Sequence, residues 1–136
     1  METYSLEADI VVRYVTAHSF PDGVLAAHQL LHKLIGKPDG RKYFGISFPN
    51  HEGIIIYKAA AEALKKDSEQ LQTLETYVIR KGDYIYADIH HYMKDVSGIG
   101  KTFQNLLANP RIDPNGACIE WYLNDTDVRC MVRLAD

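Results

Sequence analysis

The order of predicted elements constrains this fold more than any other feature, because the same order occurs twice along the chain. Segment 9–18 is rich in β-branched and aromatic residues and predicts a strand. Apolar residues at helical spacing follow over 24–35 and predict a helix that ends at Gly36. Segments 42–48 and 54–58 predict two short strands around a turn. One half therefore reads strand, helix, strand, strand.

The second half repeats this order. It contains an introductory strand at 74–80, then the series at 84–90 (strand), 96–107 (helix), 117–123 (strand) and 128–134 (strand). One such unit has too little sheet to bury its own apolar face. We therefore predict an α+β fold in which duplicated βαββ modules form a mixed, mainly antiparallel sheet, with two helices on one face and a ligand cleft on the other. The single domain spans 1–136, with pseudo-repeats at about 9–58 and 74–134 joined by 59–73.

Composition limits the partners. The formal net charge of −3 argues against general affinity for nucleic acid or for an anionic membrane, which both need excess Lys and Arg. No apolar run approaches the length of a membrane span, and the first nine residues carry three acids, so we expect the cytoplasm. Cys118 and Cys130 lack a metal-type spacing and indicate free thiols. We expect no cofactor and no metal site.

Glu120 is the best candidate for the centre of a small-molecule site. It lies in the middle of a predicted strand, where β-propensity disfavours Glu. A four-residue loop would pair Leu123 with Val128 and Trp121 with Cys130, which makes the apolar face of this hairpin the one packed on the helices. Glu120 would then lie on the opposite face, either as a ligand-contacting acid or as a solvated carboxylate on an open sheet.

The same alternation places further side chains on that face. Gly45 takes the position in the first half that Glu120 takes in the second, so one half supplies a carboxylate and the other leaves room beside it. Tyrosine rings around a carboxylate would suit a cationic or aromatic ligand. The predicted ligand-binding residues are Tyr14, Gly45, Ser47, Tyr57, Tyr86, Glu120, Tyr122 and Met131.

Three short motifs resemble those of the GyrI-like, or bacterial effector-binding, domain family. They are Ile79-Arg80-Lys81-Gly82-Asp83-Tyr84, Phe44-Gly45-Ile46-Ser47 and Cys118-Ile119-Glu120-Trp121-Tyr122-Leu123-Asn124-Asp125. The resemblance implies two βαββ modules around a ligand cleft, with Glu120 as the ligand-contacting acid that often faces cationic drugs. This chain departs from the family pattern in two ways. It has an additional segment at 59–72, which we expect to form a short helix or an exposed excursion, and it has different turns at 18–21 and 90–92.

Three functions follow as alternatives. The first is a stand-alone domain that senses or sequesters a cationic or aromatic amphipathic molecule at Glu120. The second, known among stand-alone members of the resembled family, is hydrolysis of strained electrophilic toxins, with Glu120 activating water and Tyr122 donating a proton. The third is a protein-interaction module, like family members that bind gyrase, using 59–72 or an edge strand.

Overall fold

The computed structural model describes residues 2–136. The first half contains β1 (Glu2–Leu6), β2 (Ile10–Thr16), α1 (Val24–Ile35), β3 (Tyr43–Pro49) and β4 (Ile55–Glu62). The second half contains α2 (Glu69–Gln72), β5 (Thr76–Ile79), β6 (Gly82–Ile89), a single 3₁₀ turn η1 (Tyr92–Lys94), α3 (Ser97–Leu107), β7 (Cys118–Tyr122) and β8 (Val128–Arg133). The series β2-α1-β3-β4 and β6-α3-β7-β8 share one order, as predicted.

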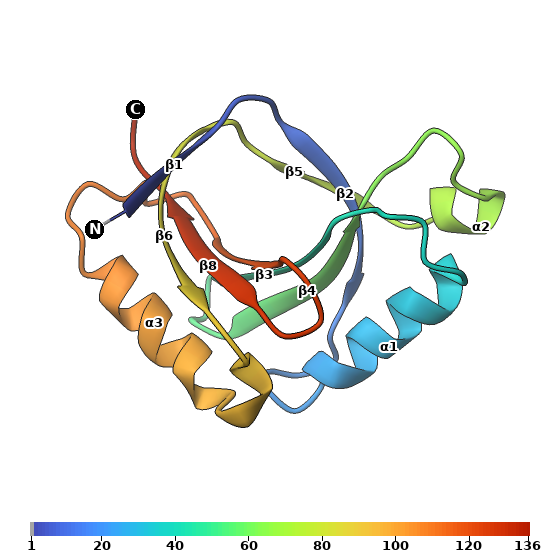
Figure 1. Cartoon of the computed structure of the whole chain (residues 1–136), viewed down its shortest axis with the longest axis horizontal. Helices are drawn as coiled ribbons and strands as arrows, with labels where there is room; N and C mark the ends of the chain where they lie inside the picture. Colours follow the sequence, from blue (N-terminus) through green and yellow to red (C-terminus); the bar gives the residue numbers. More distant parts are fainter. Residues whose placement is uncertain (1) are drawn as a thin grey trace.

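All eight strands join one sheet, in the order β1-β6-β8-β7-β3-β4-β2-β5. Each pairing found within residues 2–136 is antiparallel, so the parallel component of the predicted mixed sheet is not seen. β1 precedes β2 in the chain but pairs with β6, and β5 precedes β6 but pairs with β2. The sheet curls into a half-barrel (Figure 1). The short β1–β2 and β5–β6 links contact each other, where the Lys81 N–H donates to Asp9 Oδ1 at 2.8 Å.

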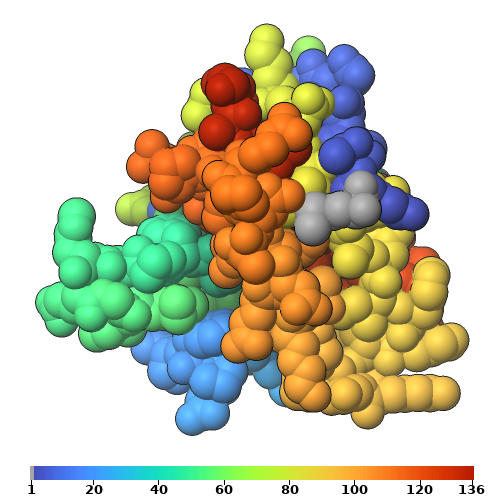
Figure 2. All heavy atoms as spheres, turned by 90° about the vertical axis from the view of Figure 1, so that its left-hand side faces the viewer, coloured from blue at the N-terminus to red at the C-terminus, as the bar shows by residue number. Residues whose placement is uncertain are grey.

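Both long helices pack on the convex face of the half-barrel. α1 buries Ala27 and Leu31 against Ala59 of β4, and α3 buries Phe103 and Leu106 against Cys130 of β8. Ala59 and Cys130 lie in one row across the sheet, so the two helices share a face, as predicted. Figure 2 shows α3, in orange, lying across this side of the molecule, with the β3–β4 hairpin in green beside it.

The concave face is also apolar, because the curled sheet encloses a second core. Fully buried side chains there include Phe44, Ile46 and Met131, each at 0 % exposure. Strands buried on both faces carry no clean alternation of apolar and polar residues. This is why the sequence pattern alone does not tell which face of a strand meets the helices.

The joining segment differs from the prediction. Residues 59–62 continue β4, and Ala59, Ala60 and Ala61 are buried, so the first part of the segment is neither helical nor an exposed excursion. Only α2 is helical, capped by the Ser68 hydroxyl, which accepts from the Leu71 N–H at 3.2 Å. Within residues 2–136, no helix is long and apolar enough to cross a membrane.

Candidate functional site

Glu120 faces the helices, on the convex side of the sheet. It pairs with Gly45 on β3 and with Cys130 on β8, and Cys130 packs in the cluster under α3. The predicted face was wrong because the β7–β8 loop has five residues between the paired strands, so Tyr122, and not Leu123, pairs with Val128. The Asn124 side chain holds this loop, accepting from the N–H groups of Thr126 at 2.8 Å and Asp127 at 2.9 Å.

The Glu120 carboxylate is bound by phenol groups. Its Oε1 accepts from the Tyr122 hydroxyl at 2.5 Å and from the Tyr57 hydroxyl at 3.1 Å. The Tyr57 hydroxyl also lies 2.8 Å from Nε2 of His28 on α1. When Tyr57 donates to Glu120, His28 must donate to the Tyr57 oxygen, which requires the proton on Nε2. A hydrogen-bonded chain thus runs from the carboxylate to α1.

Gly45 makes this arrangement possible. A Cβ at position 45 would lie 2.0 Å from Tyr57 Oη and 2.8 Å from Glu120 Oε1. Any larger residue there would drive the Tyr57 hydroxyl away from the carboxylate. The prediction that Gly45 leaves room beside Glu120 agrees with this geometry, and the Tyr57 hydroxyl occupies that room.

Aromatic rings from both halves enclose the carboxylate. Phe20, before α1, stacks on Tyr57 at 5.9 Å between ring centroids, and His28 meets Tyr122 edge-on at 5.4 Å. The ring centroid of Tyr92 of η1 lies 5.7 Å from that of Tyr122. Glu120 is 7 % exposed, so these rings leave only a small part of it accessible. Of the enclosing rings, Phe20 is the most exposed, at 46 %.

Burial dominates the electrostatics. It raises the pKa of Glu120, and the hydrogen bonds from Tyr122 and Tyr57 oppose this only in part. Burial and the nearby Glu120 charge raise the pKa of Tyr57 and of Tyr122. Burial, followed by the His32 charge, lowers the pKa of His28 to about 4. Among residues 2–136, no Lys, Arg or His lies within ion-pair distance of the Glu120 carboxylate.

The structure brings together five of the eight predicted site residues. Gly45, Ser47, Tyr57, Glu120 and Tyr122 share the convex face. The other three lie on the concave face: Tyr14, Tyr86 and Met131. The predicted faces of β2, β6 and β8 depended on the face predicted for β7. The register of the β7–β8 hairpin shows that this face was wrong.

The sequence prediction does not include three residues of the site, Phe20, His28 and Tyr92. His28 lies on the apolar stripe of α1 with Ala27 and Leu31. A polar side chain on a buried stripe needs a partner, and this was the available signal. Tyr92 belongs to the turn 90–92, where the chain departs from the family pattern, and nothing in the local sequence aims it at Glu120.

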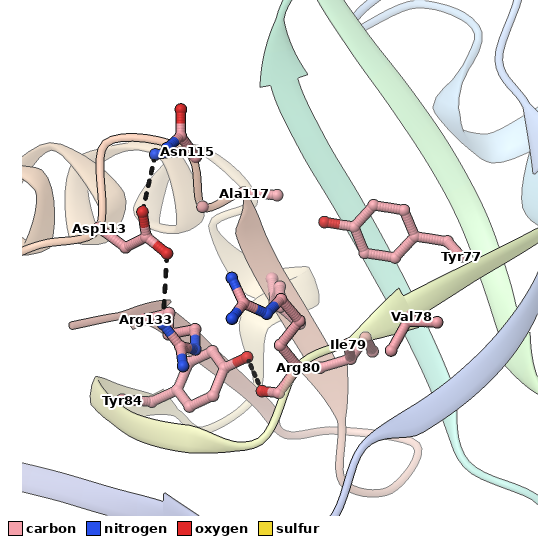
Figure 3. A pocket seen from close by; sticks show the side chains of 11 residues that line it. Tyr77, Val78, Ile79, Arg80, Tyr84, Asp113, Asn115, Ala117 and Arg133 are labelled. Carbon is pink, nitrogen blue, oxygen red and sulfur yellow. Dashed lines mark hydrogen bonds and ion pairs between the residues drawn. The ribbon is translucent and has the colours of Figure 1, made fainter. Parts of the chain in front are cut away.

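A separate cavity of about 40 Å³ lies at one end of the half-barrel (Figure 3). Its polar lining is largely engaged: Arg133 pairs with Asp113 at 3.3 Å, and the Tyr84 hydroxyl donates to the Arg80 carbonyl at 2.5 Å. Ligand pockets are usually about 300–1,000 Å³, so this space suits water and not an organic ligand. We place the candidate site at Glu120 because its carboxylate is buried and bound by two tyrosine hydroxyls.

Comparison with known proteins shows the fold. No family model matches the sequence, and no curated protein matches it. An integron cassette protein, VCH_CASS2, from the mobile metagenome of Vibrio cholerae superposes with a TM-score of 0.75 at 13% identity, covering 98% of this chain and 95% of that one. Protein SAV2435, solved with tetraphenylphosphonium bound, gives a TM-score of 0.65 at 10% identity over 98% and 93% of the chains.

A third similar structure is described as a hydrolase from Listeria innocua. It gives a TM-score of 0.57 at 11% identity, with coverage of 98% of this chain and 90% of that chain. At these identities the three structures share an architecture with this protein, and their ligands and activities are their own. The architecture is one that accommodates a small molecule in at least one of them.

Proposed function

We propose that this protein binds an amphipathic, aromatic organic cation against Glu120, between the regions covered by α1 and α3. The observation that carries the proposal is a buried carboxylate whose hydrogen-bond donors are two tyrosines and which has no cationic partner among residues 2–136. Buried carboxylates are normally paired with a cation, because an isolated buried charge is costly. A cationic ligand would supply the missing charge.

The surroundings suit such a ligand. Rings of Phe20, Tyr57, Tyr92 and Tyr122 surround the carboxylate, and aromatic faces attract cations by about 0.5–2 kcal/mol each. Tyr57 and Tyr122 bind Glu120 directly, and Phe20 and Tyr92 pack on these two rings. A ligand ring must therefore take the place of one of the four. Phe20 is the most exposed and has the least packing to lose. The tetraphenylphosphonium bound by SAV2435 is a ligand of this chemical class.

The test is calorimetric titration of the wild type, Glu120→Gln and Glu69→Gln with tetraphenylphosphonium. Glu69→Gln is the matched control, because it removes the same charge at an exposed position on α2. We expect Glu120→Gln to weaken binding roughly tenfold to a hundredfold, since a charged contact contributes about 1.5–3 kcal/mol, and Glu69→Gln to bind like the wild type. Equal affinity of Glu120→Gln and wild type would remove the carboxylate from the mechanism.

Hydrolysis is a second candidate, favoured by the contact of 2.5 Å between the Tyr122 hydroxyl and Glu120 Oε1. A carboxylate with a raised pKa can act as a general base toward water, and a phenol beside it can protonate a leaving group. The fold is shared with one protein described as a hydrolase. Turnover of an epoxide or another strained electrophile by the wild type, with none by Glu120→Gln, would favour this function over binding alone.

A further inference from the structure

The concave face of the sheet carries an arginine held by aromatic rings and by a carboxylate. The guanidinium of Arg129 on β8 lies 4.3 Å from the ring centroid of Tyr86 and 5.4 Å from that of Tyr4. Asp88, directly across the β6–β8 ladder, accepts from Arg129 Nε at 2.7 Å and from Nη2 at 3.0 Å. The Arg129 guanidinium therefore has both aromatic rings and a carboxylate as partners.

A lysine on the same face has the rings without the anion. Nζ of Lys58 on β4 lies 4.0 Å from the ring centroid of Tyr14, 5.2 Å from that of Phe48 and 5.4 Å from that of Tyr77. Among residues 2–136, no carboxylate lies within ion-pair distance of Lys58. Glu75 is in the neighbourhood, but its carboxylate accepts the Tyr14 hydroxyl at 2.5 Å.

The ladder registers put Lys58 and Arg129 at corresponding places in the two halves. Lys58 immediately precedes Ala59, the partner of Gly45, and Arg129 immediately precedes the partner of Glu120. Arg129 faces Asp88 across its ladder, and Lys58 faces Thr16. The two clusters therefore differ at the position of the counter-ion, where one half has a carboxylate and the other a hydroxyl.

The Lys58 ammonium is left partly desolvated. Lys58 is half-buried, and burial lowers its pKa, while Glu75 acts weakly in the opposite direction. Three aromatic rings offset part of the lost hydration. An anion beside the ammonium would restore the balance that Asp88 gives Arg129, and adjoining rings of Phe48 and Tyr77 offer an apolar surface for the rest of a ligand.

We propose that Lys58, with the rings of Tyr14, Phe48 and Tyr77, forms a second binding site, for a small aromatic carboxylate, with Thr16 as the uncharged neighbour across the ladder. The ligand carboxylate takes the place beside Lys58 that Asp88 takes beside Arg129. The site lies on the concave face, with the sheet separating it from Glu120. It prefers anions, whereas the site proposed at Glu120 prefers cations, so it stands or falls independently of that function.

The experiment is an NMR titration of the protein with benzoate and, separately, with benzamide, a neutral molecule of the same shape. Resonances of the Lys58 side chain, assigned with Lys58→Met, report on the site. We expect saturable shifts of these resonances with benzoate and weaker binding of benzamide. Absence of benzoate binding, or equal binding of the two molecules, would overturn the proposal.

A matched pair of variants at position 16 tests the place of the ligand carboxylate. Thr16→Asp should pair with Lys58 as Asp88 pairs with Arg129, occupy the anion position and weaken benzoate binding roughly tenfold or more, because two like charges compete for one cation. Thr16→Asn has the same shape without the charge and should retain benzoate binding. Equal benzoate affinity in Thr16→Asp and Thr16→Asn would show that benzoate binds elsewhere.

Discussion

The two halves of the sheet share an order of elements and differ where they meet. Gly45 and Glu120 face each other across the β3–β7 ladder, at corresponding places in the two series. A second glycine would leave the site without an acid, and a second glutamate would place two carboxylates against each other at the centre of the sheet. The asymmetry therefore produces a site with one carboxylate and a tyrosine hydroxyl in the space beside it.

The halves are also held differently. In the first half, Asp67 binds Arg13 and Arg41, each at 2.8 Å, and the Asp67 side chain is 0% exposed. In the second half, Arg133 pairs with Asp113 at 3.3 Å and also donates to the carbonyl of Lys81. In the first cluster two arginines share one fully buried acid, and Asp39 is a second partner of Arg41 at 2.6 Å. In the second cluster one arginine has several acceptors and no fully buried acid.

The largest expected effect breaks the first cluster. Asp67→Ala removes the buried acid shared by Arg13 and Arg41, and should lower the free energy of unfolding by about 3 kcal/mol, since Asp39 still pairs with Arg41. Asp113→Ala, the matched variant, should cost about 1–2 kcal/mol because Arg133 keeps other acceptors. Urea denaturation measures both, and equal losses would contradict the comparison.

The Asp67 cluster also predicts a pH dependence. Burial opposes ionisation of Asp67, but hydrogen bonds from the Leu64 N–H, Arg13 and Arg41 outweigh it and lower the pKa. The folded-state pKa therefore lies below the unfolded value of about 3.9, so the contribution of Asp67 is full above that pH and is lost as pH falls through the folded value. Asp67→Ala should flatten the acid limb of the stability profile.

Next in size is the glycine opposite Glu120. Gly45→Ala should lower the free energy of unfolding by about 1–3 kcal/mol, since the new Cβ collides with Tyr57, and should weaken cation binding at Glu120. Gly100→Ala on α3 is the control: its Cβ meets nothing within 4 Å, and it should be neutral or stabilising by up to about 1 kcal/mol. A Gly45→Ala protein as stable as the wild type would contradict the packing around Tyr57.

A smaller difference in stability is expected between the wild type and Glu120→Gln. The folded-state pKa of Glu120 is raised, so its contribution to stability is full below the unfolded pKa of about 4.3 and is lost as pH rises through the folded value. Relative to Glu120→Gln, the wild type should therefore lose stability as pH rises from about 4 toward neutral. Thermal unfolding of both proteins across this range measures the difference, and parallel profiles would show that Glu120 is not desolvated.

The smallest expected change in the free energy of unfolding comes from adding a counter-ion in the first half or removing one in the second. Thr16→Asp should raise the free energy of unfolding by less than about 1 kcal/mol, because the ion pair it creates with Lys58 is partly exposed. Asp88→Asn should lower it by a similar amount by removing the partner of Arg129. Thermal unfolding at low and high salt measures both, and a destabilising Thr16→Asp would contradict the correspondence of the two clusters.

Much of this architecture was predictable because helical stripes and β-branched runs are local signals. They located both long helices and the strand series, and the correspondence of Gly45 with Glu120 agrees with the register of β3 and β7. β1 was missed, since its residues form an exposed edge paired with distant β6. The predicted face of Glu120 was wrong because the loop held by Asn124 shifts the register of the hairpin by one residue. Such a shift moves the side chains of one strand to the opposite face of the sheet.

The most direct test of the central claim is where a bound cation lies. Intermolecular nuclear Overhauser effects between the phenyl protons of tetraphenylphosphonium and the protein's aromatic rings distinguish the two faces of the sheet. We expect contacts to Tyr57, Tyr92 and Tyr122, around the Glu120 carboxylate. Contacts instead to Tyr4, Tyr86 and Trp121, on the concave face, would contradict the assignment of Glu120 as the cation-binding acid.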